Sequence, residues 1–232
     1  MDPKEVLELI KRRRSIRKYK DLPVEWDKLI NILTAGEYAP SAGNVQDWKF
    51  IIVTDDETRK QIARACVNQV WMETAPLHVV ICSIPERTIQ YYGKAGEKYT
   101  IEDCSCAAEN MMVQATAEGL GCCLVSAFDE MMMRLALAIP ERATPISVLT
   151  IGYADEEVPA PPRMMLETIV YLQRYGNRFR NMNAILWDYS LQYEEFAKSA
   201  KKEAGQQGKR FMRYFKEKFS KKPEDEKQKG KH

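Results

Sequence analysis

Histidine is nearly absent from this sequence. The 232 residues include only His78, inside an apolar run, and His232, at the end of the chain. A serine or cysteine nucleophile of the hydrolase kind needs a histidine base within hydrogen-bond reach. The scarcity of histidine therefore argues against a histidine-based catalytic triad.

Long apolar runs are missing as well. No window approaches the roughly 18 consecutive apolar residues that a membrane-spanning helix needs. The opening stretch MDPKEVLELIKRRR has basic residues but no apolar run after them, so we expect no signal peptide. The sequence predicts no membrane span.

Cysteine is present, but not with the spacing of a zinc site. The pairs Cys104-x-Cys106 and Cys122-Cys123 lack the C-x-x-C pattern typical of zinc, and both fall in segments that we expect to be buried. Four thiolates around a metal are one interpretation; small apolar core residues are the favoured one, and we expect no metal. Six cysteines without an export signal are typical of reduced thiols, which predicts a cytoplasmic protein.

Charge is nearly balanced overall but uneven along the chain. The formal net charge is +2, yet residues 197–232 carry 13 lysines and arginines against 5 acidic residues. This basic tail could bind an anionic membrane or nucleic acid, aided by its aromatic residues. Alternatively, it is a solvated charged helix with a disordered end. We favour a segment 178–200 that wraps a partner subunit, followed by solvated chain, and expect no nucleic-acid partner.

The hydrophobic pattern predicts strands separated by helices without a strict βαβ rhythm, which favours an α+β layered fold. Residues 85–101 are polar and rich in tyrosine, and we expect them to pass over the core. The short apolar stretch CCLVSAF lies between a Gly-Leu-Gly helix end and the next helix. The expected strands are 49–54, 77–83 and 146–153, and the expected helices are 3–13, 26–38, 55–66, 101–118 and 129–139.

The first motif that carries chemistry is RRRSIRK near the N-terminus. Arg13, Ser15 and Arg17 alternate, so on an extended segment their side chains share one face. Two guanidinium groups and a hydroxyl on one face suit a phosphate monoester. A solvated basic patch after a helix is the alternative interpretation.

The second motif is PSAGNVQDW, residues 40–48. A surface turn needs proline and glycine, but it does not need Ser41, Asn44 and Gln46 together with Trp48. Two amides and an indole at so tight a bend indicate a role beyond the turn itself. We expect Trp48 to pack beneath the loop. An ordinary polar turn is the alternative.

These motifs, followed by a buried helix that ends in GLG and then by PPRMMLETIVY, resemble the FMN-dependent nitroreductase family of NAD(P)H oxidoreductases. The resemblance covers residues 4–175. It implies a three-layer fold with a central mixed, mainly antiparallel sheet, in an intertwined homodimer. It also implies a domain over residues 1–176 that binds FMN, with residues 177–232 as a helical, lysine-rich extension.

The resemblance also assigns roles to individual residues. Two FMN sites are implied between the subunits, with Ser41 and Asn44 approaching the ring from the partner. Asn68 or Gln69 would touch the pyrimidine end of the ring. The implied phosphate ligands are Arg13, Ser15, Arg17 and Arg163, with Arg14 in the same cluster, and the backbone donors near flavin N5 are Val125, Ser126 and Ala127.

Three positions depart from the family's pattern. Asp47 replaces the proline usual after Gln46, Ser126 lies near a usual glycine, and Ala154 stands where proline is common. None of these changes removes a phosphate ligand, and flavin carries the redox chemistry itself. We therefore expect the site to bind FMN despite them.

The resulting prediction is an FMN-dependent oxidoreductase. It would take a hydride from NADH or NADPH and pass electrons, by ping-pong chemistry, to a nitroaromatic, quinone, enone or flavin acceptor. The alternatives are a flavin-binding protein without turnover, for storage or sensing, and a nucleic-acid- or membrane-binding protein that acts through the basic tail.

Overall fold

The computed structural model of the chain describes residues 2–178. These residues belong to two compact units, Met1–Pro161 and Pro162–His232. The first unit holds the sheet and the helices around it. Within the described part of the second unit lie the short helix α7 (Leu166–Ile169) and a bridge between Tyr171 and Arg178.

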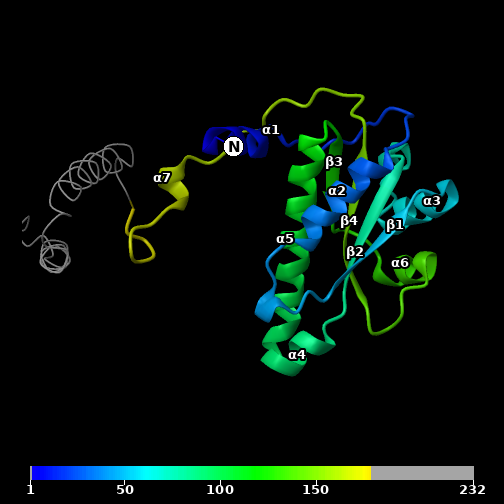
Figure 1. Cartoon of the computed structure of the whole chain (residues 1–232). Coiled ribbons are helices and arrows are strands. Elements are labelled where there is room, and N and C mark those ends of the chain that lie inside the picture. The colour runs from blue at the N-terminus through cyan, green and yellow to red at the C-terminus, as the bar shows by residue number, and fades with distance from the viewer. Residues whose placement is uncertain (1, 179–232) are drawn as a thin grey trace, which may run out of the picture. The chain divides into compact units, whose positions relative to one another are not determined.

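The first unit is built on a four-stranded sheet in the order β1-β2-β4-β3 (Figure 1). All three neighbouring pairs are antiparallel. A parallel pairing is found at the isolated bridge between Ser15 and Cys122, outside the named strands. The strands are β1 (Trp48–Val53), β2 (Leu77–Ser83), β3 (Gly121–Val125) and β4 (Thr144–Gly152).

Helices cover both faces of this sheet, which confirms the three-layer α+β fold. One apolar cluster joins α2 and α5 to β2 and β4, and a second joins α3 and α6 to the opposite side (Figure 1). Every residue of the central strand β2 is buried, as its continuous apolar run predicts. The helices of this unit are α1 (Pro3–Arg12), α2 (Trp26–Glu37), α3 (Asp56–Ala65), α4 (Glu86–Tyr92), α5 (Ala95–Ala117) and α6 (Glu130–Leu137), with 3₁₀ turns η1 (Ala42–Asn44) and η2 (Val70–Thr74).

Two segments differ from the sequence-based expectation. Residues 85–101 form α4 and the first turns of α5 rather than an irregular passage over the core. Gly96 permits the tight packing of these helices, because a Cβ there would lie 2.7 Å from the backbone nitrogen of Ile89. The stretch CCLVSAF contains β3, an edge strand of five residues that its short apolar pattern did not identify.

The six cysteines are all free thiols. Cys104, Cys122 and Cys123 are buried, as expected of core residues, but the same expectation is wrong for Cys106, which is exposed on α5. Among the described residues, no group of three or more metal-binding side chains is assembled. Nor does any described helix have the length and apolarity to cross a membrane.

Two further predictions concern the second unit: the domain boundary and the role of the C-terminal segments. The predicted domain boundary between residues 176 and 177 falls inside it. The wrapping segment 178–200 and the basic tail lie outside the described residues, apart from Arg178 itself. Both remain predictions.

Leucine side chains provide a test of the core. Leu149 is fully buried in β4, whereas Leu135 on α6 is 79% exposed. Leu149→Ala should lower the free energy of unfolding by about 2–5 kcal/mol because it leaves a cavity. Leu135→Ala, the matched control, should change it by less than about 0.5 kcal/mol. Chemical denaturation followed by circular dichroism measures both; equal losses would contradict the assigned core.

Thiol labelling provides a second test. Burial raises the pKa of Cys66, Cys104 and Cys122 to about 12 and that of Cys82 to about 11. Because the thiolate is the nucleophile, these thiols should resist iodoacetamide at pH 8, and Cys106 should react first. Mass spectrometry of peptides from the native protein identifies the labelled residue, and unfolded protein is the control. Early labelling of Cys122 would show that β3 is not buried as described.

Candidate functional site

The segment after α1 runs along the edge strand β3. The amide of Ile16 donates to the carbonyl of Cys122 at 3.0 Å, and Ser15 forms the bridge with the same residue. Ile16 packs directly on Gly121, where a Cβ would lie 2.8 Å from the Ile16 side chain. Glycine at this position therefore lets the segment approach the strand closely.

Further bonds fix the same segment downstream. The buried Tyr19 hydroxyl donates to the Ile16 carbonyl at 2.6 Å and lies 2.7 Å from the hydroxyl of Thr150 in β4. The carboxylate of Glu156 accepts from the backbone amides of Arg17 and Lys18. Main-chain contacts thus hold the segment, and the side chains of Ser15 and Arg17 remain exposed.

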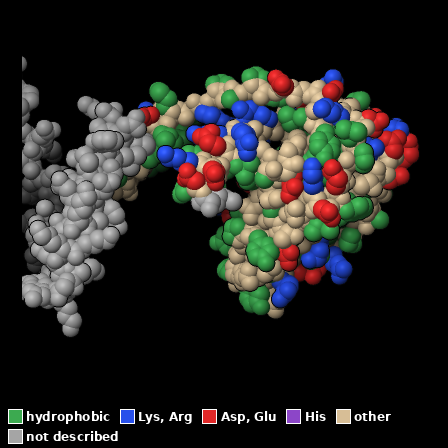
Figure 2. All heavy atoms as spheres, turned by 45° about the horizontal axis from the view of Figure 1, so that its top comes forward, with side chains coloured by type: hydrophobic (Ala, Val, Ile, Leu, Met, Phe, Trp, Pro, Cys, Tyr) green, Lys and Arg blue, Asp and Glu red, His purple; other side chains and the backbone are tan. Residues whose placement is uncertain are grey.

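Two guanidinium groups on this segment have no acidic partner. Among the described residues, no carboxylate lies within ion-pair distance of Arg13 or Arg17. Burial raises the pKa of the neighbouring Cys123 thiol, while Arg17, Ser15 and Arg13 oppose that rise, so all three lie near this thiol. Figure 2 shows lysine and arginine side chains close together on this side of the first unit. The arrangement can bind an anion.

Arg14 is placed differently from its neighbours. Its guanidinium donates to the backbone carbonyls of Lys11, Arg13 and Val158. These bonds tie the end of α1 to the segment after β4. The predicted role of Arg14 in the cofactor site stays a prediction, while its observed contacts are with the protein's own backbone.

Trp71 links Gln69 to the cation cluster. The indole Nε1 of Trp71 donates to Oε1 of Gln69 at 3.2 Å, and the Arg17 guanidinium lies over the indole ring at 5.8 Å from its centroid. Val67 and Asn68 have φ near +55°, which turns the chain sharply after α3. Gln69 and Arg17 therefore contact the same indole ring.

Val125 is the last residue of β3, and Ser126 and Ala127 follow it. Val125 is buried, whereas Ser126 and Ala127 are exposed. No backbone carbonyl of the described residues accepts from the amides of Ser126 and Ala127 outside the strands and helices. The next turn is tied to the end of α3 because the Asp129 amide donates to the Ala65 carbonyl at 2.8 Å. The amides of Ser126 and Ala127 therefore have no backbone acceptor among the described residues, and they lie just beyond the strand that Ser15 borders.

The loop of PSAGNVQDW is held by α5. The Ala42 amide lies 3.0 and 3.1 Å from the two carboxylate oxygens of Asp103. Asn44 is exposed, with φ of +56°, and Trp48 is buried in the core beneath the loop, as expected. The Gln46 amide donates to the Ser41 hydroxyl, which closes the turn.

Within one chain, this loop and the cation cluster lie at different levels of α5. The loop contacts Asp103, whereas Cys122, beside Ser15, places its thiol 3.8 Å from the Met112 carbonyl. Asp103 and Met112 are nine residues apart, or about 14 Å along the helix axis. One chain therefore brings together Arg13, Ser15, Arg17, Gln69 and residues 125–127, but not Ser41 or Asn44. Arg163 belongs to the second unit.

Sequence reasoning missed Trp71 and Asp103. Trp71 follows Gln69 by two residues, and Asp103 is an acidic residue on the buried side of a helix rich in alanine. An acid at such a position is a signal that could have been noticed, since buried carboxylates are rare without a partner.

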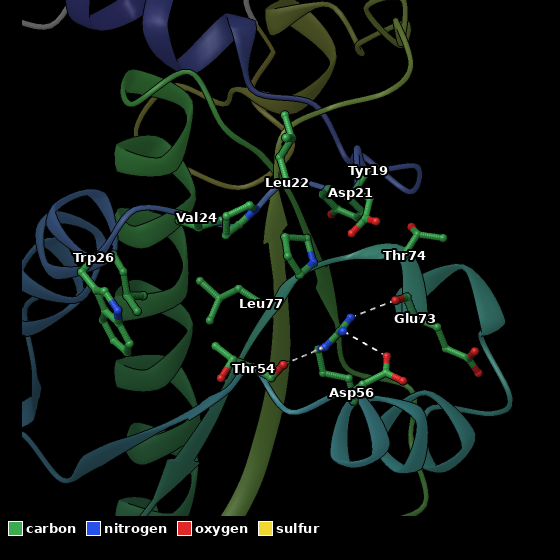
Figure 3. Close-up of a pocket in the computed structure, with 14 residues that line it drawn as sticks. Tyr19, Asp21, Leu22, Val24, Trp26, Thr54, Asp56, Glu73, Thr74 and Leu77 are labelled. Atoms are coloured by element: carbon green, nitrogen blue, oxygen red, sulfur yellow. Dashed lines mark hydrogen bonds and ion pairs between the residues drawn. The ribbon is translucent and has the colours of Figure 1, made fainter.

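A cavity of about 750 Å³ has Tyr19 of the N-terminal segment in its wall (Figure 3). Its walls include Val24 and Leu77, and none of the predicted site residues lines it. Arg59 beside it is fully engaged, because it donates to the carbonyls of Thr54 and Glu73 and pairs with Asp56. The cavity therefore offers no free cation for a phosphate.

Comparison with known proteins places the chain in a family. The sequence profile of the nitroreductase family matches residues 10–82 and 65–153. An Archaeoglobus fulgidus protein named "Putative NADH dehydrogenase/NAD(P)H nitroreductase" is 34% identical over 157 residues, which cover 66% of this chain and 87% of that protein. A Bacillus subtilis protein named "FMN reductase [NAD(P)H]" is 28% identical over 188 residues, covering 75% of this chain and 76% of the relative.

A solved structure agrees with this assignment. The FMN-dependent nitroreductase from Clostridium difficile R20291 superposes with a TM-score of 0.64 at 30% identity, covering 73% of this chain and 99% of that one. The profile match, the sequence relatives and the fold all point to one group of proteins. The chain belongs to the nitroreductase family and is an oxidoreductase.

Proposed function

We propose that this protein binds FMN beside β3 and transfers electrons from NADH or NADPH to an electron-poor acceptor. The observation that carries the proposal is the cluster of Arg13, Ser15 and Arg17 on a segment bound to β3, with no carboxylate paired to either arginine in the part of the chain that the structure describes. A rigid pair of unpaired cations is suited to a doubly charged phosphate ester.

The donor set fits the rest of FMN as well. The exposed amides of Ser126 and Ala127 would face the N5 edge of the ring, and the Gln69 side chain would meet its pyrimidine end. These groups follow the cation cluster along one strand edge and its neighbouring turn. Arg163 remains a predicted phosphate ligand.

When bound, FMN supplies the group that accepts a hydride from NAD(P)H and returns electrons to a second substrate, by ping-pong chemistry. The chain's own task is to anchor the phosphate, to hold the ring in place and to stabilise negative charge through backbone donors. His78, the histidine that the structure describes, is consistent with a site whose chemistry is carried by the flavin. Burial lowers the pKa of His78 to about 4, and its Nε2 lies 3.0 Å from the Met72 carbonyl, so it remains neutral inside the core.

A second copy of the chain would complete the site with Ser41 and Asn44. The apolar side of α1 supports such an assembly, because Val6, Leu7 and Ile10 are between 40% and 51% exposed. Exposed apolar surface of this kind is typical of an interface between proteins. The proposed acceptors are nitroaromatics, quinones, enones and flavins, and the proposed compartment is the cytoplasm.

Removing one guanidinium tests the proposed phosphate site. Arg17→Gln should weaken FMN binding about 10- to 100-fold, because a charge-assisted hydrogen bond contributes about 1.5–3 kcal/mol. Riboflavin binding should change little, since riboflavin has no phosphate. Lys20→Gln, on the same segment, removes an equal charge and is the matched control. Quenching of flavin fluorescence measures all four affinities; equal losses for FMN and riboflavin would contradict the assignment.

Turnover is tested on the wild-type protein. Loaded with FMN, it should be bleached by NADH or NADPH without oxygen and regain its colour when an acceptor is added. Absorbance near the flavin maximum measures both half-reactions. A yellow protein that neither donor reduces would instead favour the storage or sensing alternative.

A further inference from the structure

Two buried carboxylates lie beneath the loop that carries Ser41 and Asn44. Asp47, at the end of this loop, is 4% exposed, and Asp103, on α5, is 6% exposed. The Ala42 amide lies within 3.1 Å of both Asp103 oxygens. Thr88 of α4 donates its hydroxyl to Oδ2 of Asp47 at 2.6 Å. The loop is therefore bonded to two neighbouring helices through acidic side chains.

No cation balances these two carboxylates within the described residues. Burial raises the pKa of Asp103, and the negative charges of Asp47 and Glu102 raise it further, although the Ala42 amide opposes the rise. Oδ1 of Asp47 is buried and has no hydrogen-bond partner among the described residues. Such a pair costs folding free energy when both groups are ionised.

The contacts of Asp103 show which part of the structure this destabilising carboxylate supports. Ala42 begins η1, and the following residues Gly43 and Asn44 both have φ of +56°, an unfavourable conformation for most residues. On the other side of the loop, a Cβ on Gly43 would lie 2.6 Å from the Tyr92 hydroxyl. The loop thus keeps its unusual backbone because α5 binds its first amide and α4 packs against its glycine.

We infer that Asp103 is a positioning residue for the loop that presents Ser41 and Asn44, that the bond from Ala42 depends on pH through Asp103 itself, and that the buried Asp47 beside it adjusts the midpoint. The part that concerns flavin rests on the proposed function. The geometry of the loop itself does not, because it rests on the bonds of Ala42 and Thr88 to the protein's own carboxylates.

The direction of the pH effect follows from the hydrogen bond. An ionised Asp103 accepts a stronger bond from Ala42 than a protonated one does. Because the pKa of Asp103 is raised, the hold should weaken as the pH falls through a value above the ordinary range of aspartate. The other titratable groups around this site are Asp47 of the loop, Glu102 and Cys104 of α5, Cys82 of β2, and Tyr92 and Tyr99 of the α4–α5 pair.

The free energy of unfolding should change with pH in the opposite sense to the Ala42 bond, because the contribution of Asp103 becomes less unfavourable as its carboxyl group is protonated. A carboxyl group whose pKa is higher in the folded state than in the unfolded state penalises folding once the pH exceeds its unfolded pKa, with the full penalty above its folded pKa. Asp103→Asn removes that penalty and keeps an acceptor for Ala42. The variant should therefore be at least as stable as wild type at pH 7. A residue needed only for stability would not behave in this way.

The NMR signal of the Ala42 amide reports directly on its hydrogen bond to Asp103. Protein labelled with ¹⁵N-alanine should show an Ala42 signal that titrates with a midpoint above that of ordinary aspartate. The titration should vanish in Asp103→Asn and move to lower pH in Asp47→Asn. It should persist in Glu102→Gln with a smaller shift in the same direction, because the Glu102 charge affects Asp103 less and its side chain pairs with Lys98 at the surface. An Ala42 signal that does not titrate in wild type, or that still titrates in Asp103→Asn, would overturn the inference.

Flavin binding gives the second readout. Asp103→Leu, which has no acceptor, should bind FMN about tenfold more weakly at pH 7, whereas Asp103→Asn should bind nearly as wild type with a flatter pH profile. Equal losses in both variants would count against a positioning role. If wild-type protein binds no FMN at all, the proposed function fails, and the Ala42 titration still decides whether Asp103 holds the loop.

Discussion

The candidate site depends on the pairing of an extended N-terminal segment with the edge strand β3. The bridge between Ser15 and Cys122 satisfies backbone groups that would otherwise remain unpaired at a sheet edge. Because Ile16 is buried against Gly121, alternation turns its neighbours Ser15 and Arg17 outward. The basic side chains are thus fixed by main-chain contacts and core packing, and their own charges remain available for an anion.

The long helix α5 explains why one chain holds only part of the predicted constellation. It contacts β3 near one level and the loop of Ser41 and Asn44 about 14 Å away along its axis. A rigid helix cannot shorten that distance, so the loop cannot complete the cation cluster of its own subunit through local motion. In the proposed symmetric pair of chains, each loop would serve the other subunit's cluster. The distance along α5 supports that proposal.

Sequence patterns predicted most of the fold, whereas the roles of the site residues remain predictions. Continuous apolar runs identified β2 and β4, and the alternation in RRRSIRK placed Arg13, Ser15 and Arg17 on one face. The pattern failed for β3, since five residues are too few to show a period, and for α4, whose polar surface resembles that of a loop. Contacts such as that of Arg17 with Trp71 depend on tertiary packing, which local patterns do not record.

Asp47 and Asp103, beneath the loop, lower the stability of the fold but support the proposed role of the loop. An apolar pair at positions 47 and 103 would avoid desolvating two carboxylates, and replacements of this kind are often neutral or stabilising in other proteins. Such a pair would leave the Ala42 amide without an acceptor, and the left-handed residues after it would lose the bond that begins their turn. The buried charge is therefore best understood as strain located at a functional loop and supported by a large core. The ionised Asp103 lowers the stability of the fold but binds the Ala42 amide. Through this bond it positions the side chains that the loop presents.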